Sequence, residues 1–310
     1  TKNELSREQV KETNKINREL LKQKAEQLKE RIQEAKDKFK EAKDKLVEAR
    51  RSFAESREDL RNKTKEVTDF CKKNKGTECE QKKEDFVKTS AKTYLLNTIN
   101  KIENALDQRV AKINELLAKP NVTNTEVLQT RLTEISQDKA KLAEFKAQLE
   151  NATTKDQVKT VAAALKDEWK SIKDGLELSR GDILSHRFEF AVERSEELQK
   201  NLDKALEKMK AKGLDVANVQ AKVDSFNAHI ANAKDLVEQA RAKFADSSLD
   251  RATAAKTGHE LLVEAQKELN AAHGDLKSIV SLVKAQKEDV TELAKSKNET
   301  ESSDENASAA

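Results

Sequence analysis

The side chains that most often carry catalysis or bind metals are few in this chain, and they are widely spaced. No two of the four histidines lie one helical turn apart. His259-Glu260 begins like the helix of zinc proteases, but Val263 occupies the position that the second histidine ligand would need. Because a metal site requires converging ligands, we expect ordinary helix residues and no metal at His186, His229, His259 and His273.

Other catalytic signatures are missing from the sequence as well. The six glycines are scattered and form no phosphate-binding loop, and no Gly-x-Ser-x-Gly nucleophile elbow occurs. Carboxylates are abundant, but an acid-base pair needs a shielded pocket that shifts its pKa values. The single tryptophan, Trp169, is expected to anchor a helical core rather than to hold a ligand. We therefore predict a protein that is not an enzyme and has no cofactor.

The two cysteines indicate a disulfide bond. Cys71 and Cys79 flank a lysine-rich segment in which Gly76 gives the backbone freedom to reverse. A disulfide there would clamp the mouth of a helical hairpin and would imply an oxidising compartment. The alternative is a pair of free thiols in a cytosolic loop, while the spacing fits neither a metal knuckle nor a Cys-x-x-Cys motif.

Possible glycosylation sites also favour the cell exterior. The chain starts at Thr1 rather than at methionine, which fits a removed signal segment, although trimming or loss of methionine alone would look the same. Two of five Asn-x-Ser/Thr triplets fall in expected turns and two in a polar tail, where a glycan could be carried. The five asparagines are Asn62, Asn121, Asn151, Asn298 and Asn306. The cysteines and these triplets together predict an extracellular or cell-surface protein.

The charge of the chain is high but balanced. Its 60 basic and 57 acidic residues are interspersed, so we expect solvated helix faces and no binding of nucleic acid. No apolar run is long enough for a transmembrane segment. A local basic cluster near the cysteines could meet an anionic glycan, a lipid headgroup or nucleic acid. The alternative is a solvated turn, which fits the lack of interleaved aromatic residues for base stacking. This possible basic tip consists of Lys72, Lys73 and Lys75.

The elements that must position these residues are long helices. With one proline, few aromatic residues and 38% charged residues, the chain suits thin helical bundles better than a thick globular core. From residue 21 to residue 70 the apolar residues alternate in steps of four and three, which predicts a coiled coil. Large residues in one column of this seam face mostly small residues in the other, which favours an antiparallel partner. The possible assembly seam contains Leu21, Leu28, Ile32, Phe39, Leu46, Phe53, Leu60 and Val67.

A second helix, predicted over residues 80–118, would fold back along the first. The first helix, predicted over residues 3–72, could reach on the order of 100 Å and would outrun this partner. Its N-terminal part then needs another surface and is a candidate for assembly. The segment 119–125 contains the only proline and ends the second helix, with Thr125 a possible cap for the next one.

The second half of the chain repeats the first with an offset of about ninety-five residues. Each repeat is expected to contain three helices, and the last helix of one runs into the first helix of the next. Equivalent positions include Tyr94 and Phe188, Leu142 and Leu236, and Trp169 and Val263. This arrangement resembles spectrin-type repeats over residues 93–290, although no spectrin sequence motif is present and the units are shorter. The resemblance implies an end-to-end rod and assigns no partner.

The predicted fold is therefore all-α and elongated, with a long antiparallel coiled-coil hairpin followed by tandem spectrin-like three-helix bundles. The predicted segments are 1–92 for the coiled coil with its clamped turn, 93–185 and 186–295 for the two repeats, and 296–310 for a polar tail that should be disordered alone. Gly175 and Gly181 leave open whether residues 154–212 form one helix or two.

The leading functional hypothesis is an extracellular structural protein that self-associates into a cell-surface filament or coat. The alternative is a rod-like receptor or adhesin ectodomain that binds a surface protein or glycan through the tip of its hairpin. Association of opened helical bundles with lipid and a cytosolic coiled-coil scaffold are two further interpretations.

Overall fold

The computed structural model describes the backbone of residues 2–120, 122 and 125–307, and the side chains of residues 15, 18–120, 122 and 125–285. Within these ranges all regular secondary structure is helical, which confirms the all-α prediction. The chain forms two compact units, Thr1–Ile183 and Leu184–Ala310, and each is described by itself. The helices are α1 (Lys2–Lys73), α2 (Thr77–Phe86), the π-helix η1 (Val87–Ala91), α3 (Lys92–Leu117), α4 (Thr125–Asn151), α5 (Lys155–Ala211), α6 (Ala217–Ala245) and α7 (Arg251–Ala307).

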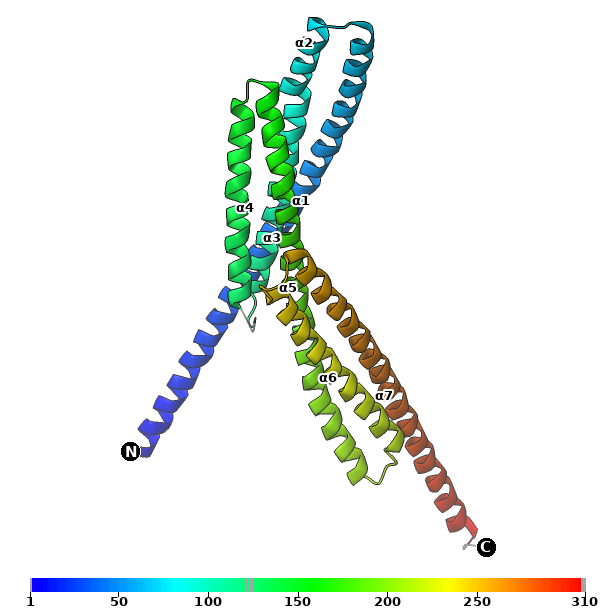
Figure 1. The fold of residues 1–310 in the computed structure, drawn as a ribbon. Coiled ribbons are helices and arrows are strands. Elements are labelled where there is room, and N and C mark those ends of the chain that lie inside the picture. The colour runs from blue at the N-terminus through cyan, green and yellow to red at the C-terminus, as the bar shows by residue number, and fades with distance from the viewer. Residues whose placement is uncertain (1, 121, 123–124, 308–310) are drawn as a thin grey trace. The chain divides into compact units, whose positions relative to one another are not determined.

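In unit 1, α1 packs along the run formed by α2, η1 and α3 (Figure 1). The chain reverses between α1 and α2 at Gly76, whose φ of 86° lies in the left-handed region that glycine tolerates best. Just before this turn, both the backbone amide and the side-chain amide of Asn74 donate to the carbonyl of Phe70. These bonds satisfy an acceptor that the end of α1 would otherwise leave open.

The heptad seam of α1 faces this partner over most of its length. Leu46 is 2% exposed, Val67 is buried, and the other apolar seam positions from Leu28 to Phe70 are at least partly buried. Lys63, a polar residue of the seam, stays exposed, because an ammonium group gains nothing from an apolar contact. Most residues of the possible assembly seam therefore pack within the chain, and Leu21 does not.

The core of unit 1 is built from one side of each of α3, α4 and the first part of α5. Fully buried side chains include Leu106 of α3, Leu142 of α4 and Ile172 of α5, while Trp169 is partly buried against the same core. The turn before α5 carries a local cap, because the Gln157 amide donates to Thr154 Oγ1 and the Thr154 amide donates to Gln157 Oε1. This reciprocal pair is a capping box.

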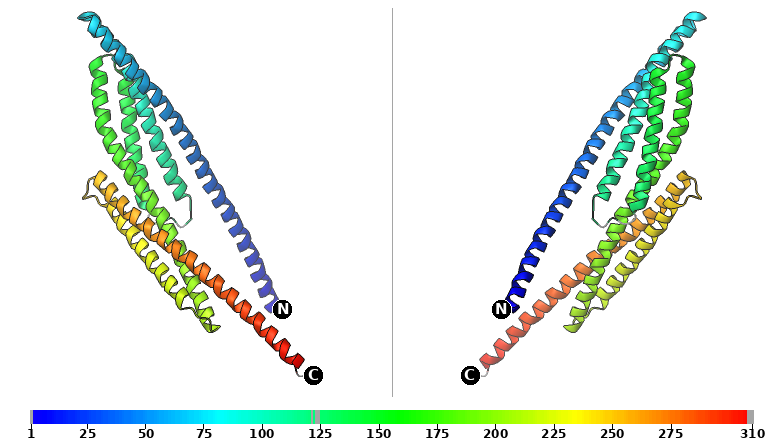
Figure 2. Two further views of the ribbon diagram at one scale, coloured as in Figure 1. Left: turned by 90° about the vertical axis from the view of Figure 1, so that its right-hand side faces the viewer. Right: turned by 90° about the vertical axis from the view of Figure 1, so that its left-hand side faces the viewer.

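The core of unit 2 is built from the second part of α5 together with α6 and α7, which pack closely side by side (Figure 2). Gly213, with a φ of 71°, ends α5 in a Schellman arrangement in which the Leu214 amide donates to the Met209 carbonyl. The turn before α7 is capped by Asp250, whose carboxylate accepts from the backbone amide and hydroxyl of Thr253.

The helix bounds show whether residues 154–212 form one helix or two and how far helix extends into the polar tail. Residues 155–211 form a single helix, α5, which continues through Gly175 and Gly181 because helix on both sides outweighs the local cost of glycine. The polar tail was expected to be disordered alone, but helical backbone of α7 continues to Ala307. A helix that is already nucleated propagates at low cost into residues without glycine or proline. Residues 308–310 lie outside the described residues.

Candidate assembly surface

The helix α1 continues beyond the point where its partner α3 ends. At this point Arg31 donates from Nη2 to the carbonyls of Leu117 and Ala118, at 3.2 and 3.3 Å. These carbonyls belong to the last turn of α3 and lack helical donors, so the guanidinium supplies hydrogen bonds and a favourable charge at the negative end of the helix dipole. Figure 2 shows α1 running on past the end of α3. We call residues 2–30 of α1 the N-terminal arm.

The described side chains of the N-terminal arm include two exposed leucines. Leu20 is 46% exposed and Leu21 is 66% exposed, and Ala25, which belongs to the same heptad seam as Leu21, is exposed as well. Leu28, one turn before α3 ends opposite Arg31, is partly buried. The seam of α1 therefore continues into the arm, whereas α3, which covers the seam in the bundle, ends before the arm begins. The earlier residues 1–14, 16 and 17 have no described side chains.

A surface groove of about 520 Å³ lies beside the end of α3. Its apolar lining comes from α1 and α3, and its charged and amide groups come from α1, α3 and α4. We call it the α3 groove. The apolar lining residues are Ala35, Val110, Ala111, Leu117 and Ala118, and the polar ones are Arg31, Glu34, Lys38, Asp107, Asn114 and Gln129.

The charges around the α3 groove are largely paired. Lys38 lies 2.7 Å from Glu34, and the pKa of Glu34 is held below its ordinary value chiefly by this hydrogen bond. Asp107 forms an ion pair with Lys139 of α4. Because these pairs neutralise one another, the groove offers an apolar floor with a polar rim rather than a strongly charged site.

Two lysines of α3 pack on phenylalanines of α1, which sequence reasoning did not anticipate. Lys101 Nζ lies 3.8 Å from the centre of the Phe53 ring, and Lys112 Nζ lies 4.5 Å from that of Phe39. Tyr94 also packs on Phe53. The pKa of Lys101 is lowered, mainly by burial and further by Arg50 and Arg57. Lysines on a highly charged helix give no sequence signal that separates such stacking from ordinary solvation.

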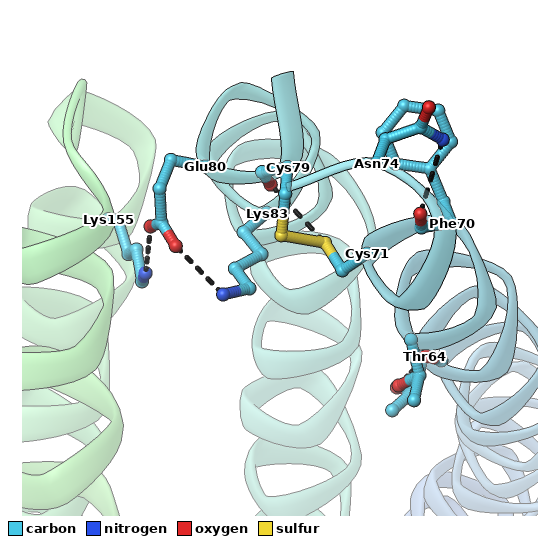
Figure 3. The surroundings of a disulfide bond; sticks show 9 residues. Thr64, Phe70, Cys71, Asn74, Cys79, Glu80, Lys83 and Lys155 are labelled. Atoms are coloured by element: carbon cyan, nitrogen blue, oxygen red, sulfur yellow. Dashed lines mark hydrogen bonds and ion pairs between the residues drawn. A yellow bond between two sulfur atoms is a disulfide. The ribbon is translucent and has the colours of Figure 1, made fainter. Parts of the chain in front are cut away.

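The disulfide predicted between Cys71 and Cys79 is formed at the turn between α1 and α2, with the two Cα atoms 5.0 Å apart (Figure 3). The lysines around it do not form a uniformly basic tip. Lys72 pairs with Asp69, and Glu80 lies between Lys83 and Lys155, at 2.8 and 3.6 Å (Figure 3). The pKa of Glu80 is lowered, chiefly by its hydrogen bond with Lys83. Lys73 and Lys75 are exposed.

The four histidines lie on helices and have different neighbours. His186 lies 3.3 Å from Glu189, and His259 packs edge-on against Phe244. His229 is placed between two carboxylates of α7, with Nδ1 2.7 Å from Glu268 and Nε2 3.8 Å from Asp275. His273 is exposed. Over the described side chains, no cluster of histidine, cysteine and carboxylate groups has the geometry to hold a metal ion.

A buried ion pair in unit 1 also lay beyond sequence reasoning. Arg131 Nε of α4 donates to Asp182 of α5 at 2.7 Å, and its Nη1 donates to Glu134 at 2.9 Å. The pKa of Arg131 is raised, because these carboxylates outweigh the effect of burial, which is the largest single influence and acts in the opposite direction. Breaking such a pair costs more than forming it gains, so we assign it to specific packing of α4 on α5.

The possible glycosylation sites fall in different environments. Asn151 is the last residue of α4 and is exposed, next to the turn that leads to α5. Asn62 is exposed in the C-terminal part of α1, and the Thr64 hydroxyl of the same triplet donates to the Leu60 carbonyl. Asn121 lies outside the described residues, and so do the side chains of Asn298 and Asn306.

Comparison with known proteins gives no family for this chain. It matches no protein-family model, no curated protein and no solved structure. Within the described residues, no helix contains an apolar stretch long enough to span a membrane.

Proposed function

We propose that this chain is an extracellular structural protein that associates with itself through the N-terminal arm, as a helical subunit of a cell-surface filament or coat. The observation that supports this most is the seam of α1, which continues past the end of α3 onto the exposed residues Leu21 and Ala25, with the exposed Leu20 next to it. A heptad seam is stable when another helix covers it, because the apolar side chains then leave water. A second chain would supply that cover.

The extracellular location is part of the same proposal. The disulfide at the hairpin turn is a bond that persists in oxidising compartments, and the exposed Asn151 next to a helix end could accept a glycan. The finer architecture, an elongated rod with a coiled-coil hairpin and spectrin-like repeats, also belongs to the proposal. It is supported by the two separate cores, each built from three helices, with α5 contributing to both.

Self-association is tested by replacing the exposed leucines with charged residues. Leu20→Glu and Leu21→Glu in one chain should weaken association by at least about tenfold, because each carboxylate would have to lose water in the contact. Sedimentation velocity over a range of concentrations measures the change. The matched control is Val47→Glu on the same helix, at a valine that is 57% exposed and directly follows the buried Leu46. A wild-type chain that stays monomeric at all concentrations would disprove the proposal.

The alternative function is binding of a surface protein or glycan through the hairpin tip. It is favoured by the exposed Lys73 and Lys75 beside the rigid disulfide turn, although acidic neighbours balance the other lysines. Lys73→Glu with Lys75→Glu should abolish retention on a sulfated glycan such as immobilised heparin and should leave the sedimentation coefficient unchanged. Equal retention of wild type and variant would exclude the tip as a charge-dependent site.

A further inference from the structure

The exposed leucines of the N-terminal arm and the α3 groove share one side of one helix. Leu20 precedes Lys38 by eighteen residues, which is five complete turns, so the two side chains leave α1 in the same direction. Lys38 lines the α3 groove. Leu20 is therefore in line with the groove but lies beyond its end, and Leu21 continues the neighbouring seam.

The arm cannot fill the groove of its own chain. The helix α1 is continuous from Lys2 to Lys73, and this stretch contains neither glycine nor proline at which it could fold back. An arm that occupied the groove beside its own Arg31 would have to reverse direction within a few residues. An arm that fills the groove must therefore come from another chain.

We propose that the N-terminal arm of a second copy of this chain lies antiparallel in the α3 groove, with Leu20 and Leu21 against the apolar floor formed by Ala35, Val110 and Ala111. This inference rests on the proposed self-association and specifies its partner and geometry. Covering leucines that are 46% and 66% exposed removes apolar surface from water, which supplies the driving force.

Charge and symmetry both fit a second copy. Around the two leucines, residues 18–26 of the arm carry Arg18, Lys22 and Lys24 against Glu19 and Glu26. The groove rim pairs Lys38 with Glu34, so no strong net repulsion opposes the contact. Arm and groove are adjacent on one surface of α1, which allows a two-fold arrangement in which each chain inserts its arm into the other. Such an isologous contact closes on itself, so the product is a dimer. Growth into a filament then uses a different surface of that dimer.

The test uses full-length chains with the native disulfide intact and one added cysteine each. A Leu20→Cys chain is mixed with an Ala111→Cys chain and treated with a short bis-maleimide, which does not attack the oxidised Cys71–Cys79 pair. We expect a mixed covalent dimer as the main product. The matched control replaces the first chain with Val47→Cys, which lies twenty-seven residues or seven and a half turns from Leu20 and so points to the opposite side of α1. We expect no mixed dimer from this control.

The outcomes separate this inference from the proposed function. If the wild-type chain sediments as an oligomer but Leu20→Cys is linked only to Leu20→Cys, the arms pair with each other and the groove proposal is overturned while self-association stands. If the wild-type chain sediments as a monomer, both fail. A chain that carries Leu20→Cys and Ala111→Cys together should stop at covalent dimers, and a ladder of larger products would overturn the two-fold arrangement.

A second variant removes any dependence on cross-linking chemistry. Ala111→Glu places a carboxylate in the floor of the groove and should weaken association by at least about tenfold, as replacement of the arm leucines does. Its helix content, measured by circular dichroism, should equal that of the wild type, because Ala111 is only partly buried in its own chain. Unchanged association of a folded Ala111→Glu chain would contradict the placement of the arm in the groove.

Discussion

Small residues decide how closely α6 and α7 approach each other. Ala233 and Ala240 of α6 and Ala265 of α7 are completely buried, although an alanine side chain contributes little apolar area. Their value lies in the short distance that they allow between helices, so that larger side chains such as Phe226 and Phe244 fill the remaining space. Gly258 continues this pattern, because its Cα faces the ring of Phe244.

Two glycines of α7 provide a matched pair for testing this packing. A Cβ atom added at Gly258 would lie 2.4 Å from Phe244 Cε1, whereas one added at Gly274 would meet no atom within 4 Å. We expect Gly258→Ala to destabilise unit 2 by about 1–3 kcal/mol, because the buried Phe244 ring, which also packs on His259, has little room to move. Gly274→Ala should instead stabilise it by up to about 1 kcal/mol through helix propensity.

Urea unfolding followed by circular dichroism measures both variants. Both substitutions exchange the same residue types in the same helix, so the difference between them isolates the contact with Phe244. Equal midpoints for the two alanine variants would show that this contact imposes no constraint.

At the scale of elements, side chains from neighbouring segments complete the helix ends. Lys92 of α3 donates to the Glu150 carbonyl at the end of α4, at 2.8 Å, much as Arg31 of α1 donates to the end of α3. Both are cations at the negative end of a helix dipole. The start of α5 is closed locally by the capping box of Thr154 and Gln157. These contacts place helix ends in register with their neighbours where the apolar seams alone would allow sliding.

The capping box can be tested with two threonine variants, one directly before α5 and one inside it. Thr154→Ala removes the acceptor of the Gln157 amide and should lower the unfolding free energy by about 1 kcal/mol. Thr160→Ala, at an exposed position inside the same helix, should be neutral or slightly stabilising, because its hydroxyl only bonds back to the Asp156 carbonyl. Urea midpoints of the two variants are compared directly. A loss of stability in Thr160→Ala as large as that in Thr154→Ala would remove the cap as the cause.

At the scale of the whole molecule, stability is divided between two hydrophobic cores. The core of unit 1 and the core of unit 2 contain separate sets of buried residues, and only α5 contributes to both. The disulfide lies in unit 1, where it ties the end of α1 to α2. A chain with two cores does not have to unfold in a single step.

Removal of the disulfide should therefore act mainly on unit 1. In the loop-entropy model, opening a loop of this length costs about 2.5 kcal/mol. Cys71→Ser with Cys79→Ser should lower the calorimetric transition of unit 1 and move that of unit 2 much less. Gly258→Ala shifts the transition of unit 2 and identifies it. Equal shifts of both transitions by the cysteine variant would mean that the two cores unfold as one cooperative unit.

The sequence by itself determined the helices and the face by which α1 packs. The steps of four and three between apolar residues define a stripe on any helix, whatever covers it, and so they predicted which apolar residues of α1 from Leu28 to Phe70 would be at least partly buried. Gly76 and the cysteine pair were also predictable, because chain reversal and cross-linking here depend on residues close together in the sequence.

Only the tertiary structure decided which surfaces stay open and which polar groups meet. Leu20 and Leu21 are exposed because α3 ends opposite Arg31. That end point depends on how α1 and α3 are positioned along one another. The stacking of Lys101 on Phe53 depends likewise on the alignment of two helices. Charged residues occur throughout the chain and carry no mark of their partner, since an ion pair or a cation–ring contact is a property of distance between elements and not of spacing along one of them.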